Sequence, residues 1–194
     1  SLKIAIQGIK GSNHHQVAKD CFGDDIELVE CLSFDALVDK LLPNEADQGV
    51  MAIENSIAGS IIPNYALVNH NDLHIIGEYY LSIRHNLMVL KGQNIEDITE
   101  VSSHPMALLQ CKEYFRQYPN IKLVEDVDTA EIAKRIQEQK LMHVAAIAPN
   151  VAAELYGLDL VANDIQTIQN NATRFIIVKT KNNVLPEAEI TKAS

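Results

Sequence analysis

The chain has 194 residues, of which 47% are hydrophobic and 22% charged, with 26 acidic and 16 basic side chains and a net charge of −10. The apolar content excludes a disordered chain, and the negative charge disfavours nucleic acid and anionic membrane surfaces as partners. No stretch reaches the ~20 apolar residues of a membrane span. The three cysteines lie far apart without metal-ligand spacing, so we expect a cytoplasmic protein with reduced thiols, no membrane partner and no metal.

The first 70 residues alternate short strands with helices. Ser33 is a good N-cap for the second helix, and Pro43 ends that helix. The third strand is continuously apolar, which is typical of a strand buried on both faces. The expected strands are 3–6, 26–31 and 49–53, and the expected helices are 15–22, 34–42 and a third from the turn at 54–56 to about residue 70.

A second alternation follows an extended stretch at 73–90, which is interrupted near 84–86. Gly157 stands where a left-handed helix C-cap is expected, and Asp128 with Glu131 resembles a capping box. The expected strands are 101–102, 121–124, 143–148 and 175–178, and the expected helices are 105–118, 129–139 and 150–156.

This repeated alternation predicts an α/β fold with mostly parallel sheets. One sheet of about nine strands would satisfy the pattern. We favour two lobes, because the extended stretch at 73–90 is typical of a crossover and the last strand would return to the first lobe. The predicted lobes are 1–78 with 174–194, and 79–173. Ligands of open α/β sheets bind beyond the carboxyl ends of strands, so we expect a central cleft there.

The turn after the third strand is the first candidate for chemistry. Glu54, Asn55 and Ser56 follow a buried strand directly, and Gly59 permits close backbone approach. The alternative is that Asn55 and Ser56 only cap the next helix.

The second candidate begins at Ser103-His104-Pro105, where Pro105 fits the first turn of a helix. Ser103 and Gln110 are seven residues apart, close to two helical turns, so we expect them on one face. The alternative is a capping residue and an outward-facing glutamine.

The third candidate, Asn170 to Phe175, stands just before the final strand. In a regular strand Thr173 and Arg174 point to opposite faces, so both reach one ligand only where the chain is irregular. Adjacent His14 and His15 do not converge on a helix, and we expect no metal site there.

These three blocks, in this order, resemble the signature motifs of the prephenate dehydratase family. The matching segments are Glu54-Asn55-Ser56 with Gly59, Ser103-His104-Pro105 with Gln110-Cys111, and Asn171-x-Thr173-Arg174-Phe175, within about 3–178. The resemblance implies a two-lobed fold similar to the type II periplasmic binding proteins. It also implies a lyase that converts prephenate, a small dicarboxylate, to phenylpyruvate in phenylalanine biosynthesis, without metal or organic cofactor.

With this resemblance, Thr173 is the predicted donor to the departing hydroxyl. Arg174 is suited to bidentate carboxylate binding, and Glu54 is an orienting or structural residue. The predicted substrate-binding residues are Asn55, Ser56, Ser103, Gln110, Arg174 and Phe175.

Two other functions stay open at this point: arogenate dehydratase, and a non-catalytic small-anion-binding module on the same scaffold. Family members commonly continue into a phenylalanine-binding ACT domain. We expect this chain to lack that domain and therefore not to respond to phenylalanine. The family also suggests a homo-oligomer, for which we expect a dimer.

Overall fold

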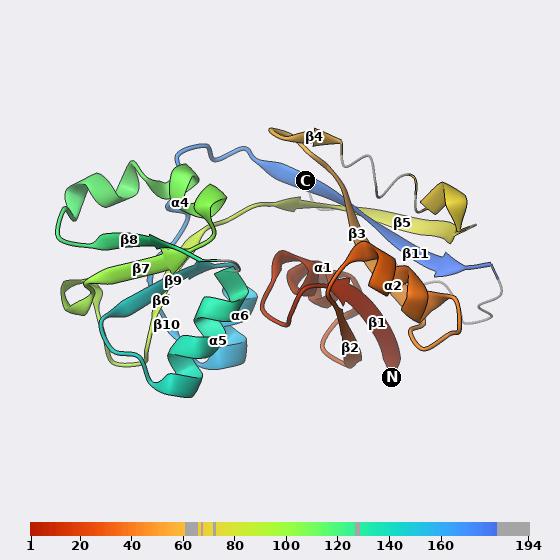
Figure 1. The fold of residues 1–194 in the computed structure, drawn as a ribbon, viewed down its shortest axis with the longest axis horizontal. Coiled ribbons are helices and arrows are strands. Elements are labelled where there is room, and N and C mark those ends of the chain that lie inside the picture. The colour runs from red at the N-terminus through yellow and green to blue at the C-terminus, as the bar shows by residue number, and fades with distance from the viewer. Residues whose placement is uncertain (61–65, 67, 72, 127–128, 182–194) are drawn as a thin grey trace. The chain divides into compact units, whose positions relative to one another are not determined.

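The computed structural model describes residues 1–60, 66, 68–71, 73–126 and 129–181. These residues form two compact units, each built on one sheet (Figure 1). Unit 1 takes its described residues from 1–9, 13–83 and 171–181, and unit 2 from 10–12 and 84–170. The sequence prediction placed the lobe boundaries after residues 78 and 173, whereas the chain leaves unit 1 after Ile83 and returns at Asn171.

The sheet of unit 1 has the strand order β2-β1-β3-β11-β5, and β4 pairs with the end of β3. The first three strands are parallel, whereas β11 runs antiparallel to both β3 and β5. The strands are β1 (Leu2–Gln7), β2 (Ile26–Cys31), β3 (Gln48–Asn55), β4 (Gly59–Ser60), β5 (Leu73–Ser82) and β11 (Ala172–Thr180).

Helices α1 (Asn13–Phe22) and α2 (Phe34–Leu41) each pack on a hydrophobic cluster of this sheet. Ser33 begins α2 as predicted, since its hydroxyl accepts a hydrogen bond from the Ala36 amide at 3.1 Å. Phe175 and Ile177 of β11 belong to the cluster with α1, whereas their neighbours Ile176 and Val178 belong to the cluster with α2. The strand is therefore buried on both faces, which explains its continuous apolar run.

The sheet of unit 2 has the order β8-β7-β9-β6-β10, with β8, β7 and β9 parallel and β6 antiparallel to both β9 and β10. Gly157 ends α6 in the left-handed conformation (φ 63°), as predicted. The strands are β6 (Asn86–Val89), β7 (Glu100–Ser103), β8 (Lys122–Glu125), β9 (Val144–Ala148) and β10 (Asp159–Ala162). The helices are α4 (Pro105–Cys111), α5 (Thr129–Gln139) and α6 (Asn150–Tyr156), with single 3₁₀ turns at Ile95–Asp97 and Tyr114–Gln117.

The prediction of mostly parallel sheets is wrong, although the α/β class and its division into two sheets are confirmed. In each unit the fourth strand, β11 or β6, runs antiparallel to both of its neighbours, so the strand beyond it, β5 or β10, has the same direction as the parallel strands. Strand β10 was not predicted from the sequence.

Two predicted helices also differ. The helix expected over 105–118 ends at Cys111, and a separate 3₁₀ turn follows it. Where the third helix was expected to begin, β4 turns back to pair with β3, and Gly59 has a positive φ of 86° that suits this turn. The rest of that helix falls mostly on residues outside the described ranges, as does Asp128 of the predicted capping box.

Candidate functional site

A hydrogen bond joins the segment that ends β3 to the segment that begins β11 in unit 1. The Asn55 side-chain nitrogen donates to the Thr173 hydroxyl oxygen at 2.8 Å, across 118 residues of sequence. The two residues stand opposite each other in the register of these antiparallel strands. Two motifs that are distant in the sequence thus come together at the carboxyl end of β3, where ligands of α/β sheets commonly bind.

The hydrogen bonds of its side-chain oxygen fix the orientation of the Asn55 amide. Its oxygen accepts hydrogen bonds from the backbone amides of Ile57 at 2.9 Å and Ala58 at 3.0 Å, so its nitrogen must face Thr173. The Thr173 oxygen therefore accepts this bond and keeps its own proton for donation. Thr173 is only 8% exposed, and no acceptor for that proton lies among the described residues.

Ser56 ties the same two segments together at a second point. Its hydroxyl donates to the Asn171 side-chain oxygen at 3.3 Å and accepts from the Ala172 amide at 2.9 Å. Its backbone amide also donates to the Ala172 carbonyl at 2.9 Å. Asn55 and Ser56 therefore stand at the start of a hairpin turn between β3 and β4 instead of capping a helix, which was the alternative interpretation. Both residues hold the segment that carries Thr173.

Thr173 and Arg174 lie on opposite faces of the sheet. The register of β11 with β5 is regular from Ala172 to Ile177, and the shift against β3 falls between Arg174 and Phe175. The irregularity therefore does not turn Thr173 and Arg174 to the same side. The Arg174 Nε donates to the Glu78 carboxylate at 2.8 Å, and both side chains are more than two-thirds buried.

The other two predicted residues of unit 1 differ in exposure. Glu54 is exposed and stands opposite Arg174 in the strand register. Phe175 is 2% exposed and packs edge-on against the His14 ring, with centroids 5.1 Å apart. Burial lowers the pKa of His14 to about 4, and its Nε2 has no hydrogen-bond partner, so the ring is neutral near pH 7.

In unit 2, Ser103 and Gln110 lie at the end of β7 and in α4. Ser103 is fully buried, and its carbonyl accepts from the Asp126 amide at 2.8 Å. His104 is the N-cap of α4, since its Nδ1 accepts from the Met106 amide at 3.1 Å. The Gln110 side chain is half-buried, and its amide oxygen lies 2.6 Å from the Nε2 of His85.

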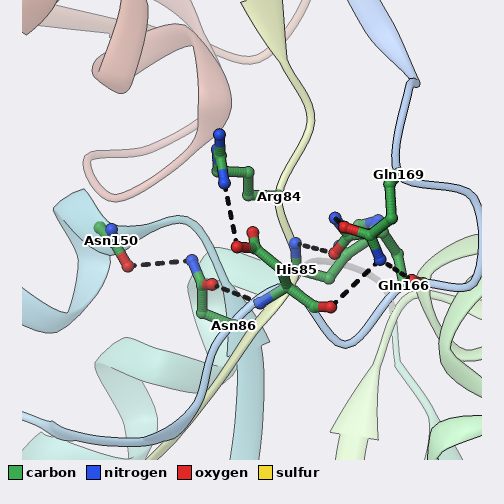
Figure 2. Close-up of polar contacts among 7 residues, drawn as sticks. Arg84, His85, Asn86, Asn150, Gln166 and Gln169 are labelled. Carbon is green, nitrogen blue, oxygen red and sulfur yellow. Dashed lines mark hydrogen bonds and ion pairs between the residues drawn. The ribbon is translucent and has the colours of Figure 1, made fainter.

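His85, the partner of Gln110, was not among the residues predicted from the sequence. It lies just before β6, between Arg84 and Asn86 (Figure 2). Arg84 forms an ion pair with Asp164 at 2.9 Å, and the Asn86 side chain donates to Asn150 at 2.9 Å. The available signal was the place of His85 at the break in the extended stretch, but its partner Gln110 is 25 residues away.

The structure thus groups the predicted residues within each unit: Asn55, Ser56 and Thr173 in unit 1, and Ser103 and Gln110 in unit 2. Their joint action on one substrate stays a prediction. Within the described part of the chain, no group of three or more His, Cys, Asp or Glu side chains is placed to hold a metal ion. No helix in those residues is long and apolar enough to cross a membrane.

Comparison with known proteins decides the family. The sequence profile described as prephenate dehydratase matches residues 4–183, nearly the whole chain. The chain belongs to the prephenate dehydratase family. Its three motif blocks all lie inside the matched region.

Individual members and neighbours agree with this placement. Arogenate dehydratase/prephenate dehydratase 2, chloroplastic, of Arabidopsis thaliana is 39% identical over 177 residues, which cover 91% of this chain and 46% of that protein. The crystal structure of prephenate dehydratase from Arthrobacter aurescens in complex with L-Phe matches with a TM-score of 0.81 at 27% identity, over 96% of this chain and 62% of that chain. The quorum-quenching acylase GqqA matches with a TM-score of 0.83 at 27% identity, over 95% of this chain and 66% of that chain.

This member of the prephenate dehydratase family therefore spans less than half the length of the Arabidopsis relative. The matched part contains the pair Asn55–Thr173 of unit 1 and the pair His85–Gln110 of unit 2.

Proposed function

We propose that the chain catalyses the decarboxylating dehydration of prephenate to phenylpyruvate, with release of water and carbon dioxide, in L-phenylalanine biosynthesis. Membership of the prephenate dehydratase family supports this activity. The observation that carries the proposal is the Asn55–Thr173 hydrogen bond. It leaves the Thr173 hydroxyl proton available at the carboxyl end of β3, where ligands of α/β sheets commonly bind.

The reaction needs little from the protein beyond positioning and help to the departing hydroxyl. The bond from the ring to its carboxylate breaks, and the electron pair enters the ring as the carbon–hydroxyl bond breaks on the other side. The carboxylate leaves as carbon dioxide, and the hydroxyl takes up one proton and leaves as water. The ring becomes aromatic, so a donor at the departing oxygen contributes about 10²–10⁴-fold if a proton moves in the transition state.

Thr173 supplies this donor in our proposal. A threonine hydroxyl is a weak acid, but a hydrogen bond accepted from Asn55 polarises it and makes it a better donor. Asn55 orients the hydroxyl, and Ser56 fixes the strand start through Asn171 and Ala172. These two residues act mainly through the position of Thr173.

The remaining predicted residues have different places in the proposal. Ser103 and Gln110 provide neutral hydrogen bonds to the substrate oxygens, as predicted from the sequence. Arg174 steadies β11 through Glu78 instead of binding the carboxylate, because its side chain lies on the face opposite Thr173. Phe175 supports the strand from the core, and exposed Glu54 keeps the predicted orienting or structural role.

Arogenate is the second candidate substrate, because the Arabidopsis relative is named for both activities. Its side chain carries an amino group in place of the keto group, while the ring chemistry is the same. Turnover of the two compounds measured side by side decides between them. The cytoplasmic location and the dimer also stay predictions, and the Arabidopsis relative is named as chloroplastic.

A pair of isosteric threonine variants tests the proposal. Thr173→Val keeps the shape of the side chain but removes the hydroxyl, so we expect phenylpyruvate formation to fall by about 10²–10⁴-fold. Thr173→Ser keeps the hydroxyl, so it should retain most of the activity.

The matched control is Thr180→Val at the far end of the same strand. The Thr180 hydroxyl is buried and has no hydrogen-bond partner among the described residues, so its removal should leave activity unchanged and not destabilise the fold. Full activity in Thr173→Val would reject Thr173 as the donor. Tight binding of prephenate without turnover in the unaltered protein would instead favour the non-catalytic binding module.

A further inference from the structure

The contact between His85 and Gln110 has a defined direction. The amide oxygen of Gln110 faces the Nε2 of His85 at 2.6 Å, and an oxygen can only accept a hydrogen bond. Burial lowers the pKa of His85, so the ring is neutral near pH 7 and carries one N–H. That N–H is therefore at Nε2.

The same contact determines which atoms of Gln110 remain for another ligand. With its oxygen held by His85, the amide presents its NH₂ group, which has two donors and no acceptor capacity. Rotation of the amide by half a turn would place its NH₂ group against Nε2, and the bond would then form only with the ring proton on Nδ1. The half-buried glutamine is thus set as a donor, which suits the oxygens of a dicarboxylate.

The backbone around both residues is held by one segment of three residues. The Ile165 amide donates to the His85 carbonyl at 2.9 Å, and the Thr167 amide donates to the Gln110 carbonyl at 2.9 Å. Between them, the Gln166 side-chain oxygen accepts from the His85 amide at 2.8 Å (Figure 2). Segment 165–167 therefore fixes the spacing between the ring and the amide.

We propose that His85 is a positioning residue, which as the Nε2–H tautomer locks the Gln110 amide so that its NH₂ group donates to the substrate. This role rests on the proposed dehydratase function. It parallels the pair Asn55–Thr173 of unit 1, where an anchored partner likewise leaves one donor available. The substrate group it serves is a carboxylate or hydroxyl oxygen.

A double-mutant cycle tests the proposal, since it measures whether two residues act through each other. His85→Phe keeps a ring of similar size without the donor, and we expect kcat/KM to fall about tenfold, which corresponds to about 1.4 kcal/mol. Gln110→Ala alone should lower kcat/KM by at least that factor. In the Gln110→Ala background, His85→Phe should have no further effect.

Equal factors in both backgrounds would show that His85 acts independently of Gln110 and would overturn the proposal. His85→Gln, whose amide can donate in place of the ring, should recover part of the loss if the donor is what matters. No recovery, in a variant that keeps the unfolding midpoint of the unaltered protein, would also count against it.

A second measurement does not depend on activity. Nitrogen-15 NMR of the unaltered protein at pH 7.5 should show the His85 proton on Nε2, and the Gln110 side-chain amide resonances should shift in His85→Phe. A proton on Nδ1 would overturn the proposal even if the dehydratase activity is correct. If neither prephenate nor arogenate is turned over but the Nε2–H tautomer is found, the proposed function fails while the amide lock stands.

Discussion

The two sheets have the same pattern of strand directions but obtain their fourth strand in different ways. In unit 1 the fourth strand is β11, from the end of the described chain, and in unit 2 it is β6, which follows directly from β5. In both units the candidate polar residues cluster where this antiparallel strand begins, Thr173 in β11 and His85 just before β6. The start of the fourth strand is thus the place in each sheet where side chains from distant segments meet.

The two units differ in what brings these side chains together. In unit 1 two neighbouring strands place Asn55 directly opposite Thr173, so sheet register positions the pair. In unit 2 the pair joins a strand end to a helix, and segment 165–167 fixes its spacing. The position of Thr173 thus depends on strand pairing, one side-chain hydrogen bond and the neighbouring turn. The positions of His85 and Gln110 depend on several hydrogen bonds to the loop at 165–167.

Of the effects expected from this comparison, the largest comes from Asn55→Asp, which tests the Asn55–Thr173 pair. The carboxylate still accepts from the amides of Ile57 and Ala58, but it cannot donate to Thr173 and accepts the threonine proton instead. We expect kcat to fall by about 10²–10³-fold, as for loss of one preorganised donor, with little change in the urea unfolding midpoint. Unchanged kcat would mean that the direction of this hydrogen bond has no part in catalysis.

A smaller effect distinguishes His14 of unit 1 from His85 of unit 2, namely how each makes the free energy of unfolding depend on pH. The pKa of His14 is about 4 because the ring is desolvated without a partner, whereas the bond to Gln110 partly offsets the lowering for His85. Between pH 6.5 and about 4 the unfolded chain binds a proton at position 14 that the folded chain does not. The free energy of unfolding therefore falls on acidification, by up to about 1.4 kcal/mol per pH unit.

Urea unfolding of His14→Phe as a function of pH provides the measurement. The aromatic ring is retained beside Phe34 and Phe175, and the acid-sensitive contribution disappears, so the curve should be flatter than that of the unaltered protein below pH 6.5. The matched variant His85→Phe in unit 2 should flatten it less. Parallel curves for the unaltered protein and His14→Phe would contradict the lowered pKa.

The smallest effect concerns Arg174, and it sharpens the assignment of faces in unit 1. Glu78→Gln removes the negative charge that Arg174 pairs with. Because the pair is partly exposed, we expect a loss of about 1 kcal/mol in the free energy of unfolding. Arg174→Met should cost a similar amount, with no change in KM. A KM that rises tenfold or more in Arg174→Met alone would restore the carboxylate-binding role predicted from the sequence.

The sequence predicted most buried strands and helices, because continuous apolar runs and capping residues are local signals. Ser33 begins α2 and Gly157 ends α6, as expected for this reason. Strand direction is a long-range property, so the reversal at β11 and β6 was not visible in the alternation of elements. Among the described residues the helix over 105–118 was predicted too long, since its apolar pattern does not distinguish α4 from the 3₁₀ turn that follows.

The candidate residues were found through motif resemblance more than through pattern. Spacing alone suggested only that Asn55 and Ser56 form a turn, and the structure shows that this turn holds Thr173. The pair His85–Gln110 was not predicted, because nothing local in the sequence reports a contact across 25 residues. The opposite faces of Thr173 and Arg174 followed from strand geometry, and the regular register with β5 bears this out.

The place of β11 has a consequence for synthesis of the chain. In the described residues β5 pairs only with β11, and β11 lies between β5 and β3. The edges of β3 and β5 that face β11 therefore stay unpaired until residues 172–180 have left the ribosome. The strands of unit 2, by contrast, all lie within residues 84–170 and need no later partner. Because domains fold as their segments emerge, unit 2 is expected to complete its sheet first. Until then strands β1 to β5 of unit 1 have exposed edges, which favour aggregation or chaperone binding.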